Sequence, residues 1–465
     1  MIQKSTISNK WWVLLAIGTG TFMTALDGSV VNTILPVIRK DFSSDIASVE
    51  WIIIIYLLVV SVLLPIFGRL GDIRGHKQVY ITGFVLFITS SILCAYSRSI
   101  NFLITSRAIQ ALGAAMLSAN SPAILTKSFP DNQRGQALGM QATMTYLGLT
   151  VGPSLGGWLT DQFNWNVVFM INLPVGIIAL IFSALFIAKD KPEIIKERFD
   201  FPGAFLFMLG LIALLLGLNQ GHKWEWLSLP TLSILFFSII LFGIFYKMER
   251  KSIAPMLDFN LFHNRLFTLS IISAILNYIC VYSSIFLMPF YLIQGRGLSP
   301  SQAGLILTAQ PIMMAIIAPI SGTVSDRIGS RIPTTIGMCL IAIGLYLLSG
   351  VGKETQYQSI IISLLVLGLG IGIFISPNNS ALMGSAPGYR QGIAAGLLAT
   401  ARNVGMVLGV GLSGAIFNSF FNSDLPNNGQ SLYLALHNSF LVACIVAIIG
   451  VILSSIRSAS NSNLV

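Results

Sequence analysis

The chain has 465 residues, of which 54% are hydrophobic and only 9% are charged, and its mean hydropathy is +0.80. An ordinary soluble domain carries about 25% charged residues, so this composition excludes a soluble globular protein and predicts that the chain lies in lipid. The four cysteines are far apart in apolar runs and lack metal-ligand spacing, so we expect them to be apolar core residues and expect no metal site.

Fourteen apolar runs are long enough to cross a bilayer as helices, since a span needs about 20 residues. They lie near 11–38, 49–67, 78–97, 102–126, 135–160, 167–188, 202–219, 228–246, 266–293, 303–324, 332–350, 358–384, 391–417 and 434–456. The first run is too long for a signal peptide, so we expect an uncleaved span. The short connections leave no room for a catalytic or nucleotide-binding domain. The fold class is therefore all-α integral membrane.

The basic residues predict the orientation of these spans. An even number of spans places both termini on one side. With the termini in the cytoplasm, 19 of the 27 Lys and Arg residues fall in cytoplasmic segments and six in external ones. Arg107 and Arg402 fall within spans. This bias is what the positive-inside rule predicts, and it explains the net charge of +10 without nucleic acid. We expect a multi-pass protein of the cytoplasmic (inner) membrane with cytoplasmic termini.

An internal repeat divides the chain. The segment Gly68–Lys77 recurs as Gly322–Arg331 at an offset of 254 residues. Two later landmarks keep nearly the same offset: Pro122 with Pro377, and Arg134 with Arg390. We therefore expect two parallel six-helix bundles at 1–200 and 251–465, with two inserted transmembrane helices at 201–250. Transporters use parallel halves of this kind, with the substrate site near the bilayer midplane between them.

The repeated loop has a plain physical interpretation. Gly68 and Gly75 permit a tight turn, and Asp72 can accept hydrogen bonds from nearby bases or from a helix N-terminus. A latch of this kind would hold one conformation and release in another. Its other candidate residues are Lys77 in the first loop and Asp326, Arg327 and Arg331 in the second. The alternative is a turn that merely joins two helices.

Several segments resemble motifs of one transporter family. They are the first-span run Leu26–Pro36, the loop Gly68–Lys77 (with departures at Ile73 and His76), the fourth-span run Leu103–Gly113, the fifth-span run Gly148–Gly157, and the run Trp165–Gly176. Together they resemble the major facilitator superfamily, specifically its fourteen-span drug:proton antiporters. The fifth-span run matches that branch's antiporter motif at every defining position and is the most specific of these signals.

The resemblance implies a proton-coupled antiporter of the multidrug efflux type, connected with antibiotic resistance. It implies no cofactor, because the proton gradient is the energy source, and it gives Arg107 a part in proton relay. In the antiporter motif, Gly148, Gly152 and Gly156 share one helix face and would let another helix approach closely, while Pro153 can kink the helix and Gly157 completes the motif.

Asp27 is the one acid among 17 that we place deep within a span. A charged Asp at a helix centre costs about 2.5–3.5 kcal/mol on insertion scales, and burial favours its neutral, protonated form. Asp27 is therefore a candidate proton carrier that could also attract a cationic substrate. The alternative is an acid held in a structural pair. Contact between Asp27 and Arg107 is open at this stage.

Candidate substrate contacts are polar or aromatic residues within spans: Asn32, Gln141, Tyr146, Asn277, Tyr278, Tyr282, Gln310 and Asn378. Tyr278 and Tyr282 are four residues apart and so share a helix face. Buried amides also serve as hydrogen-bonding glue between helices, and the sequence leaves both roles open.

The functional expectation is proton-driven export of hydrophobic or cationic drugs and toxic compounds by alternating access. The alternative is an exporter or flippase of an endogenous amphiphile such as a fatty acid or lipid. We expect no enzyme, because no buried catalytic set occurs, and no ATP-driven pump, because no GxxxxGK[ST] loop occurs. The expected partners are small molecules, protons and the lipid bilayer, with a monomeric protein. No coupling element for a periplasmic adaptor is visible.

Overall fold

The computed structural model describes residues 3–130, 133–188, 200–221, 224–225, 227–250, 259–387, 391–421 and 428–457, which are helical apart from their connections. The repeat landmark Arg390 lies outside these residues. The chain divides into two compact units, each described by itself: Met1–Phe199 with Ser299–Leu305, and Asp200–Leu298 with Ile306–Val465.

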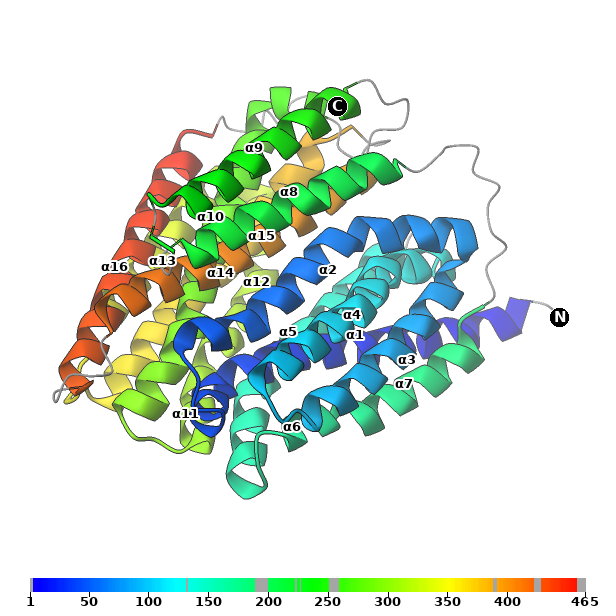
Figure 1. Ribbon diagram of the computed structural model, residues 1–465. Coiled ribbons are helices and arrows are strands. Elements are labelled where there is room, and N and C mark those ends of the chain that lie inside the picture. The colour runs from blue at the N-terminus through cyan, green and yellow to red at the C-terminus, as the bar shows by residue number, and fades with distance from the viewer. Residues whose placement is uncertain are drawn as a thin grey trace. The chain divides into compact units, whose positions relative to one another are not determined.

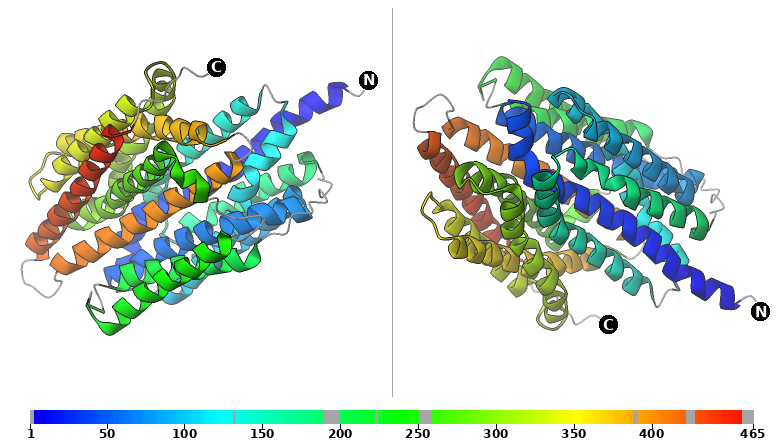
Figure 2. Two further views of the ribbon diagram at one scale, coloured as in Figure 1. Left: turned by 90° about the horizontal axis from the view of Figure 1, so that it is seen from above. Right: turned by 90° about the horizontal axis from the view of Figure 1, so that it is seen from below.

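Among the described residues up to 188, the first unit contains α1 (Gln3–Asp41), α2 (Ile46–Arg74), α3 (His76–Ala95), α4 (Ile100–Ser128), α5 (Arg134–Gln162), the short α6 (Val167–Met170) and α7 (Asn172–Phe186) (Figure 1). α1 packs along α5 and also contacts α7 and α4, while α4 packs on α2 and α3. Figure 2 shows α1 as the long dark-blue helix of this unit.

The second unit contains α8 (Phe201–Gln220), α9 (Leu229–Glu249), a 3-10 turn (Phe259–His263), α10 (Arg265–Pro289) and a π-helical segment (Phe290–Gly295). It continues with α12 (Ala309–Ile328), α13 (Arg331–Ser349), α14 (Tyr357–Ser385), α15 (Gln391–Phe420) and α16 (Asn428–Ser455). The short α11 (Pro300–Leu307) begins in the segment that packs with the first unit.

Short polar side chains fix where several helices begin. The side chain of Asp45 accepts a hydrogen bond from the backbone N of Ser48 (3.1 Å) before α2, and Ser99 does the same before α4. Asn264 accepts from the first backbone N–H groups of α10. These side chains satisfy N–H groups that have no partner within the helix, so each apolar run becomes one helix with a defined start.

Twelve of the described helices are long and apolar enough to span a membrane, so the expected count of fourteen is not confirmed. The two expected spans not among them are 135–160 and 202–219. α5 is 29 residues long but rich in glycine and polar residues, which lowers its hydropathy. In α8 only the shorter stretch Pro202–Leu214 qualifies among the described residues. The division into 6 + 2 + 6 spans stays a prediction.

Glycines at helix crossings repeat between the two units. In the first, α3 and α4 cross at Gly83 and Gly113, where a Cβ added at Gly113 would lie 2.7 Å from the carbonyl oxygen of Gly83. In the second, α13 and α14 cross at Gly337 and Gly370, where a Cβ at Gly370 would lie 2.7 Å from the carbonyl oxygen of Gly337. Each unit thus brings the same two helices into backbone contact. The internal repeat is therefore a structural one.

The helices α8 and α9, which the sequence predicts to be an insertion, pack against each other as a green pair in Figure 2 and are grouped with the second unit. The hydroxyl of Ser238 donates to the backbone oxygen of Gly210 (2.8 Å), and the ring of Phe207 packs against Phe242 and Phe245. α8 also contacts α15.

Candidate functional site

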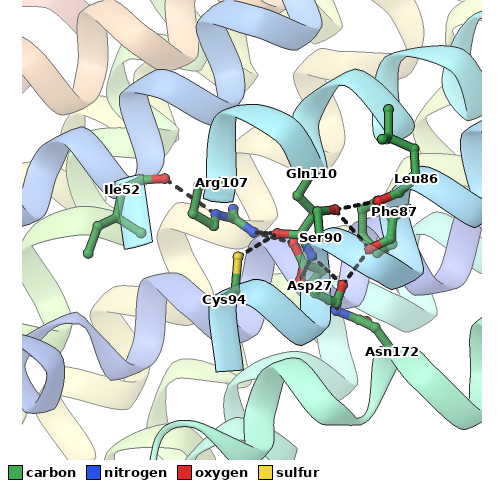
Figure 3. Close-up of polar contacts among 10 residues, drawn as sticks. Asp27, Ile52, Leu86, Phe87, Ser90, Cys94, Arg107, Gln110 and Asn172 are labelled. Carbon is green, nitrogen blue, oxygen red and sulfur yellow. Dashed lines mark hydrogen bonds and ion pairs between the residues drawn. The ribbon is translucent and has the colours of Figure 1, made fainter. Parts of the chain in front are cut away.

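In the first unit, Asp27 of α1 is the centre of a buried network of charged and polar side chains. One carboxylate oxygen accepts a hydrogen bond from Nη1 of Arg107 on α4, at 2.6 Å. The other accepts from Nε2 of Gln110 (3.0 Å) and from Nδ2 of Asn172 on α7 (2.8 Å). Figure 3 shows the three side chains converging on Asp27. The ion pair that the sequence left open is therefore formed.

Arg107 is held on every side. Its exposed fraction is 1%, and its Nη1 also donates to Oε1 of Gln110 at 2.6 Å. Its Nε donates to the backbone oxygen of Ile52, and its guanidinium carbon lies 4.1 Å from the ring centroid of Tyr56 on α2. Hydrogen bonding, ion pairing and cation–π attraction together compensate for removing this charge from water.

The two amides extend the network to α3. Nε2 of Gln110 donates to the hydroxyl of Ser91 at 2.7 Å, and that hydroxyl in turn donates to the backbone oxygen of Phe87. Asn172 also reaches the hydroxyl of Ser91, at 3.3 Å. One buried cluster thus joins α1, α3, α4 and α7.

The network is neutral as a whole because the carboxylate and the guanidinium cancel. Removing one partner of a buried ion pair costs about 3–5 kcal/mol, because the other charge is left uncompensated. Protonation of Asp27 has the same consequence, since it cancels the negative charge and leaves Arg107 without a counter-charge. Loss of either charge would therefore disturb a cluster that contacts α1, α3, α4 and α7.

The expected close approach at the antiporter motif is observed, and the partner helix is α1. A Cβ added at Gly148 would lie 2.6 Å from the backbone oxygen of Phe22, and one at Gly152 would lie 2.6 Å from the side chain of Ser29. A Cβ at Gly156 would meet Val30 at 2.5 Å. The three glycines form one face of α5, and they bracket Asp27 along α1.

The other two motif residues face a different segment of the first unit. Pro153 lies inside α5, and its backbone oxygen is against the position where a Cβ of Gly304 would be. Gly157 is equally tight against the backbone of Pro300. This side of α5 therefore packs on the segment Ser299–Leu305 without room for a side chain at either glycine.

The loop between α2 and α3 is clamped to its neighbours. Asp72 lies 3.4 Å from Nε2 of His76, whose Nδ1 is 2.8 Å from Oδ1 of Asn120 on α4. Lys77 donates to backbone oxygens at the end of α7. Gly75 has φ = 94°, a conformation that favours glycine, whereas a Cβ at Gly68 would be 4.0 Å from its nearest neighbour, Ala119. The turn therefore requires Gly75 more than Gly68.

The repeated loop between α12 and α13 has the same turn with different side-chain surroundings. Gly329 has φ = 79°, as expected for the counterpart of Gly75. Arg327 and Arg331 are exposed, and the side chain of Asp326 lies outside the described part of the structure. The latch proposed for this loop stays a prediction.

The candidate substrate contacts of the first unit do not form one cluster with Asp27. Asn32 is buried on α1, and Nε2 of Gln141 on α5 donates to the hydroxyl of Thr21 on α1 (3.3 Å). Tyr146 is half-buried on α5. The amide of Gln141 thus serves, at least in part, to join two helices.

Two amides of the second unit are also engaged between helices. Oε1 of Gln310 accepts from the hydroxyl of Ser284 (3.2 Å). Asn378 donates to the backbone oxygen of Ser270 and accepts from Nη2 of Arg457 (2.7 Å). Burial lowers the pKa of Arg457 to about 10. These contacts favour the role of interhelical glue for Gln310 and Asn378.

Asn277, Tyr278 and Tyr282 lie in α10 with different surroundings. Asn277 is fully buried, and its amide has no hydrogen-bond partner among the described residues. Tyr278 and Tyr282 both lie within electrostatic reach of the Arg402 guanidinium of α15. The structure thus brings together the two tyrosines and Arg402.

Burial alone does not distinguish Asp27 from other acids. Glu50 near the start of α2 and Glu249 at the end of α9 are each 2% exposed, against 4% for Asp27. What sets Asp27 apart is its place in the middle of α1, bonded to a base and two amides. Gln110 and Asn172 were not among the predicted site residues, although both are amides in apolar spans, and that was the available signal.

Comparison with known proteins indicates a family of membrane transporters. A family model described as the Major Facilitator Superfamily matches residues 17–257 and 270–461. The riboflavin transporter RibZ of Clostridioides difficile (strain 630) is 35% identical over 96% of this chain and 97% of its own length. The multidrug transporter protein MdtP of Bacillus subtilis (strain 168) is 30% identical over 90% of this chain and 77% of its own length.

Solved structures agree on the fold. A crystal structure of a POT family transporter in complex with 5-aminolevulinic acid has a TM-score of 0.71 at 15% identity, covering 95% of this chain and 96% of that one. A bacterial homologue of the human lysosomal transporter Spinster has a TM-score of 0.70 at 14% identity, covering 96% of both chains. With the family match over most of its length, the chain belongs to the Major Facilitator Superfamily and is a multi-pass membrane transporter of small molecules.

Proposed function

We propose that this transporter is a proton-coupled antiporter that exports hydrophobic compounds, drugs among them, from the cytoplasm by alternating access. The observation that carries the proposal is the buried ion pair between Asp27 and Arg107, whose oxygen-to-nitrogen distance is 2.6 Å. Two side-chain amides donate hydrogen bonds to the other carboxylate oxygen of Asp27. The site therefore stabilises the negative charge of Asp27, and we expect it to rearrange when that charge is lost.

The coupling works through the helices that share the network. A proton on Asp27 weakens its attraction to Arg107, which then relies on Gln110, the Ile52 backbone and the Tyr56 ring. Moving a two-state equilibrium from 1:99 to 99:1 takes about 5.5 kcal/mol, and breaking a buried pair supplies about 3–5 kcal/mol of this. The gradient adds about 2.3 kcal/mol per charge per 100 mV.

The test uses purified protein in liposomes with an imposed pH gradient and a panel of fluorescent drugs. Wild type is expected to move compounds only while the gradient stands. Asp27→Asn keeps an amide of the same shape but carries no titratable proton, and its gradient-driven transport should fall at least about 100-fold.

Glu354→Gln is the matched control, since Glu354 is an exposed acid and should leave transport unchanged. Gradient-dependent efflux that persists in Asp27→Asn, with protein of normal size-exclusion profile, would sink the assignment of Asp27 as the proton site.

A second candidate cargo is riboflavin. It is favoured by one observation, the 35% identity to a riboflavin transporter over nearly the full length of both chains. The same liposomes test this cargo when they are loaded with labelled riboflavin. Saturable transport that unlabelled riboflavin inhibits by competition would support riboflavin as a cargo. Absence of transport in both directions would argue against it.

The expected preference for cationic drugs has less support than export itself. The oxygens of Asp27 are taken up by Arg107, Gln110 and Asn172, and once protonated the group is neutral. Neither form offers a free negative charge to a cationic cargo. Export of an endogenous amphiphile stays an alternative that a transport assay with fatty acids and lipids would test.

A further inference from the structure

Arg402 is an exposed cation on a stretch of α15 whose other side chains are buried or half-buried. It lies in the middle part of α15, and between Ala401 and Asn418 it is the one exposed residue. A charged side chain in the hydrocarbon of a bilayer is costly, so such residues face a bundle interior or a water-filled path rather than lipid. The exposed face of α15 at Arg402 is therefore a polar surface of the second unit.

The helix crossing next to Arg402 places two aromatic rings beside it. A Cβ added at Gly405 would lie 2.6 Å from the backbone oxygen of Ile275 and 2.8 Å from Cβ of Tyr278. A Cβ at Gly409 would lie 3.1 Å from Cβ of Tyr282. With α10 and α15 in backbone contact, both tyrosines start from the side of α10 that faces α15, Tyr278 about one turn and Tyr282 about two turns beyond Arg402.

The guanidinium is held at this level of the helix. Arg402 could extend along α15 toward the helix end, as long basic side chains often do. Its electrostatic interaction with Tyr278 and Tyr282 places it beside the middle of α10 instead. The charged guanidinium therefore lies beside two phenol rings.

The charge is not neutralised within the part of the chain that the structure describes. Arg107 in the first unit has Asp27 at 2.6 Å, whereas no carboxylate forms an ion pair with Arg402 among the described residues. A guanidinium without a counter-charge attracts an anion and also stacks on aromatic faces. Two tyrosines add flat apolar surface for a ring.

We propose that Arg402, Tyr278 and Tyr282 form a cargo subsite in the second unit that selects aromatic compounds bearing an anionic group. The subsite rests on the proposed export function for its cargo, but not on proton coupling. Arg402 provides the charge that recognises the anion, and the rings of Tyr278 and Tyr282 provide the aromatic surface beside it.

Equilibrium binding of two dyes with the same ring system and opposite charge tests the subsite. Fluorescein is anionic and rhodamine 123 is cationic at pH 7.5, and both share the xanthene core. Fluorescence anisotropy with purified wild-type protein is expected to give a Kd for fluorescein at least about 10-fold below that for rhodamine 123.

Variants assign the preference to the residues. Arg402→Gln should weaken fluorescein binding about 10-fold and leave rhodamine 123 unchanged or tighter, and Arg402→Lys should fall between, because lysine keeps the charge but not the planar fork. Tyr278→Phe keeps the ring and removes the hydroxyl near Arg402, so it should weaken fluorescein binding by about 2- to 3-fold at most. Arg98→Gln, at an exposed arginine between α3 and α4, is the control and should change neither dye.

Tighter binding of rhodamine 123 than of fluorescein by the wild type, or unchanged fluorescein binding in Arg402→Gln, would overturn the subsite. If Arg402→Gln does not purify as a single species, the wild-type comparison and Arg402→Lys still decide. Binding needs no gradient, so a failure here is distinct from a failure of proton coupling, which Asp27→Asn reports.

Discussion

The two units share a scaffold but place their charges differently. α5 packs on α1 through Gly148 and Gly152, and α15 packs on α10 through Gly405 and Gly409, with matching backbone neighbours. A fixed offset along the sequence relates the two α5 glycines to the two α15 glycines. The same offset relates Arg107 to Leu364 and Gln110 to Leu367, and both leucines are fully buried. The polar network of the first unit thus corresponds to apolar packing in the second.

The reverse holds around Arg402. Tyr278 and Tyr282 lie against the α15 glycines as Ala25 and Ser29 lie against the α5 glycines, so these residues correspond between the units. The position that corresponds to Arg402 is Thr145. The position related to Asp27 is Cys280, which donates to the backbone oxygen of Ala443. The repeat therefore conserves how helices cross, while each unit carries its own charged cluster. This is why we assign the proton site to one unit and a cargo subsite to the other.

The largest effect is expected when the charge of the first unit is transplanted into the second. Leu364→Arg buries a guanidinium where no acid is available among the described neighbours, and it should cost more than about 3 kcal/mol and leave little folded protein. Leu364→Met keeps the volume and should cost less than about 1.5 kcal/mol. Yield and thermal stability in detergent measure both, and a well-folded Leu364→Arg would show that the two units are more alike than the structure indicates.

The ion pair itself gives the next effect. Arg107→Ala should destabilise the protein by about 3–5 kcal/mol because Asp27 is left charged and buried. Adding Asp27→Asn in the same chain removes the stranded charge and should recover part of that loss. The double-mutant cycle, read by thermal unfolding, should therefore be strongly non-additive, and simple additivity would mean that the two side chains do not interact.

The glycine crossings should respond alike in both units. Gly152→Ala and Gly409→Ala each force a methyl group into a neighbouring helix, and each should cost about 1–3 kcal/mol. Gly396→Ala, on α15 but with open space around the added carbon, is the control and should be neutral or slightly stabilising. A large cost in one unit only would argue that the crossings are not equivalent.

The smallest effect concerns the two turns. Gly75→Ala and Gly329→Ala place a side chain at positive φ, and each should cost about 1–2 kcal/mol. Gly384→Ala, which has ordinary φ and free space, controls for the general effect of removing a glycine from the unfolded chain. Transport rates of the two turn variants would also show whether the loops act as latches, since a mere turn loses stability without a change in gating.

The sequence by itself determined which parts of this chain are helices in lipid. Long apolar runs with few charges have one stable form in a bilayer, because every backbone polar group must find its partner within the segment. The repeated turn and its glycine at positive φ were equally predictable from the sequence, because few other residues adopt that conformation. The motif Gly148–Gly156 predicted a close helix contact, and the structure confirms it and identifies α1 as the partner.

Only the tertiary structure decided which side chains meet. Arg107 and Asn172 lie 80 and 145 residues from Asp27 along the chain, and nothing in this spacing shows that the three share one site. The same limit applies to Tyr278 and Arg402, and to the amides of Gln310 and Asn378, whose engagement between helices depends on neighbours that periodicity does not name. Hydrophobic patterns fix the helices because water and lipid act on each segment alone. Polar partners are fixed by packing, which depends on all segments together.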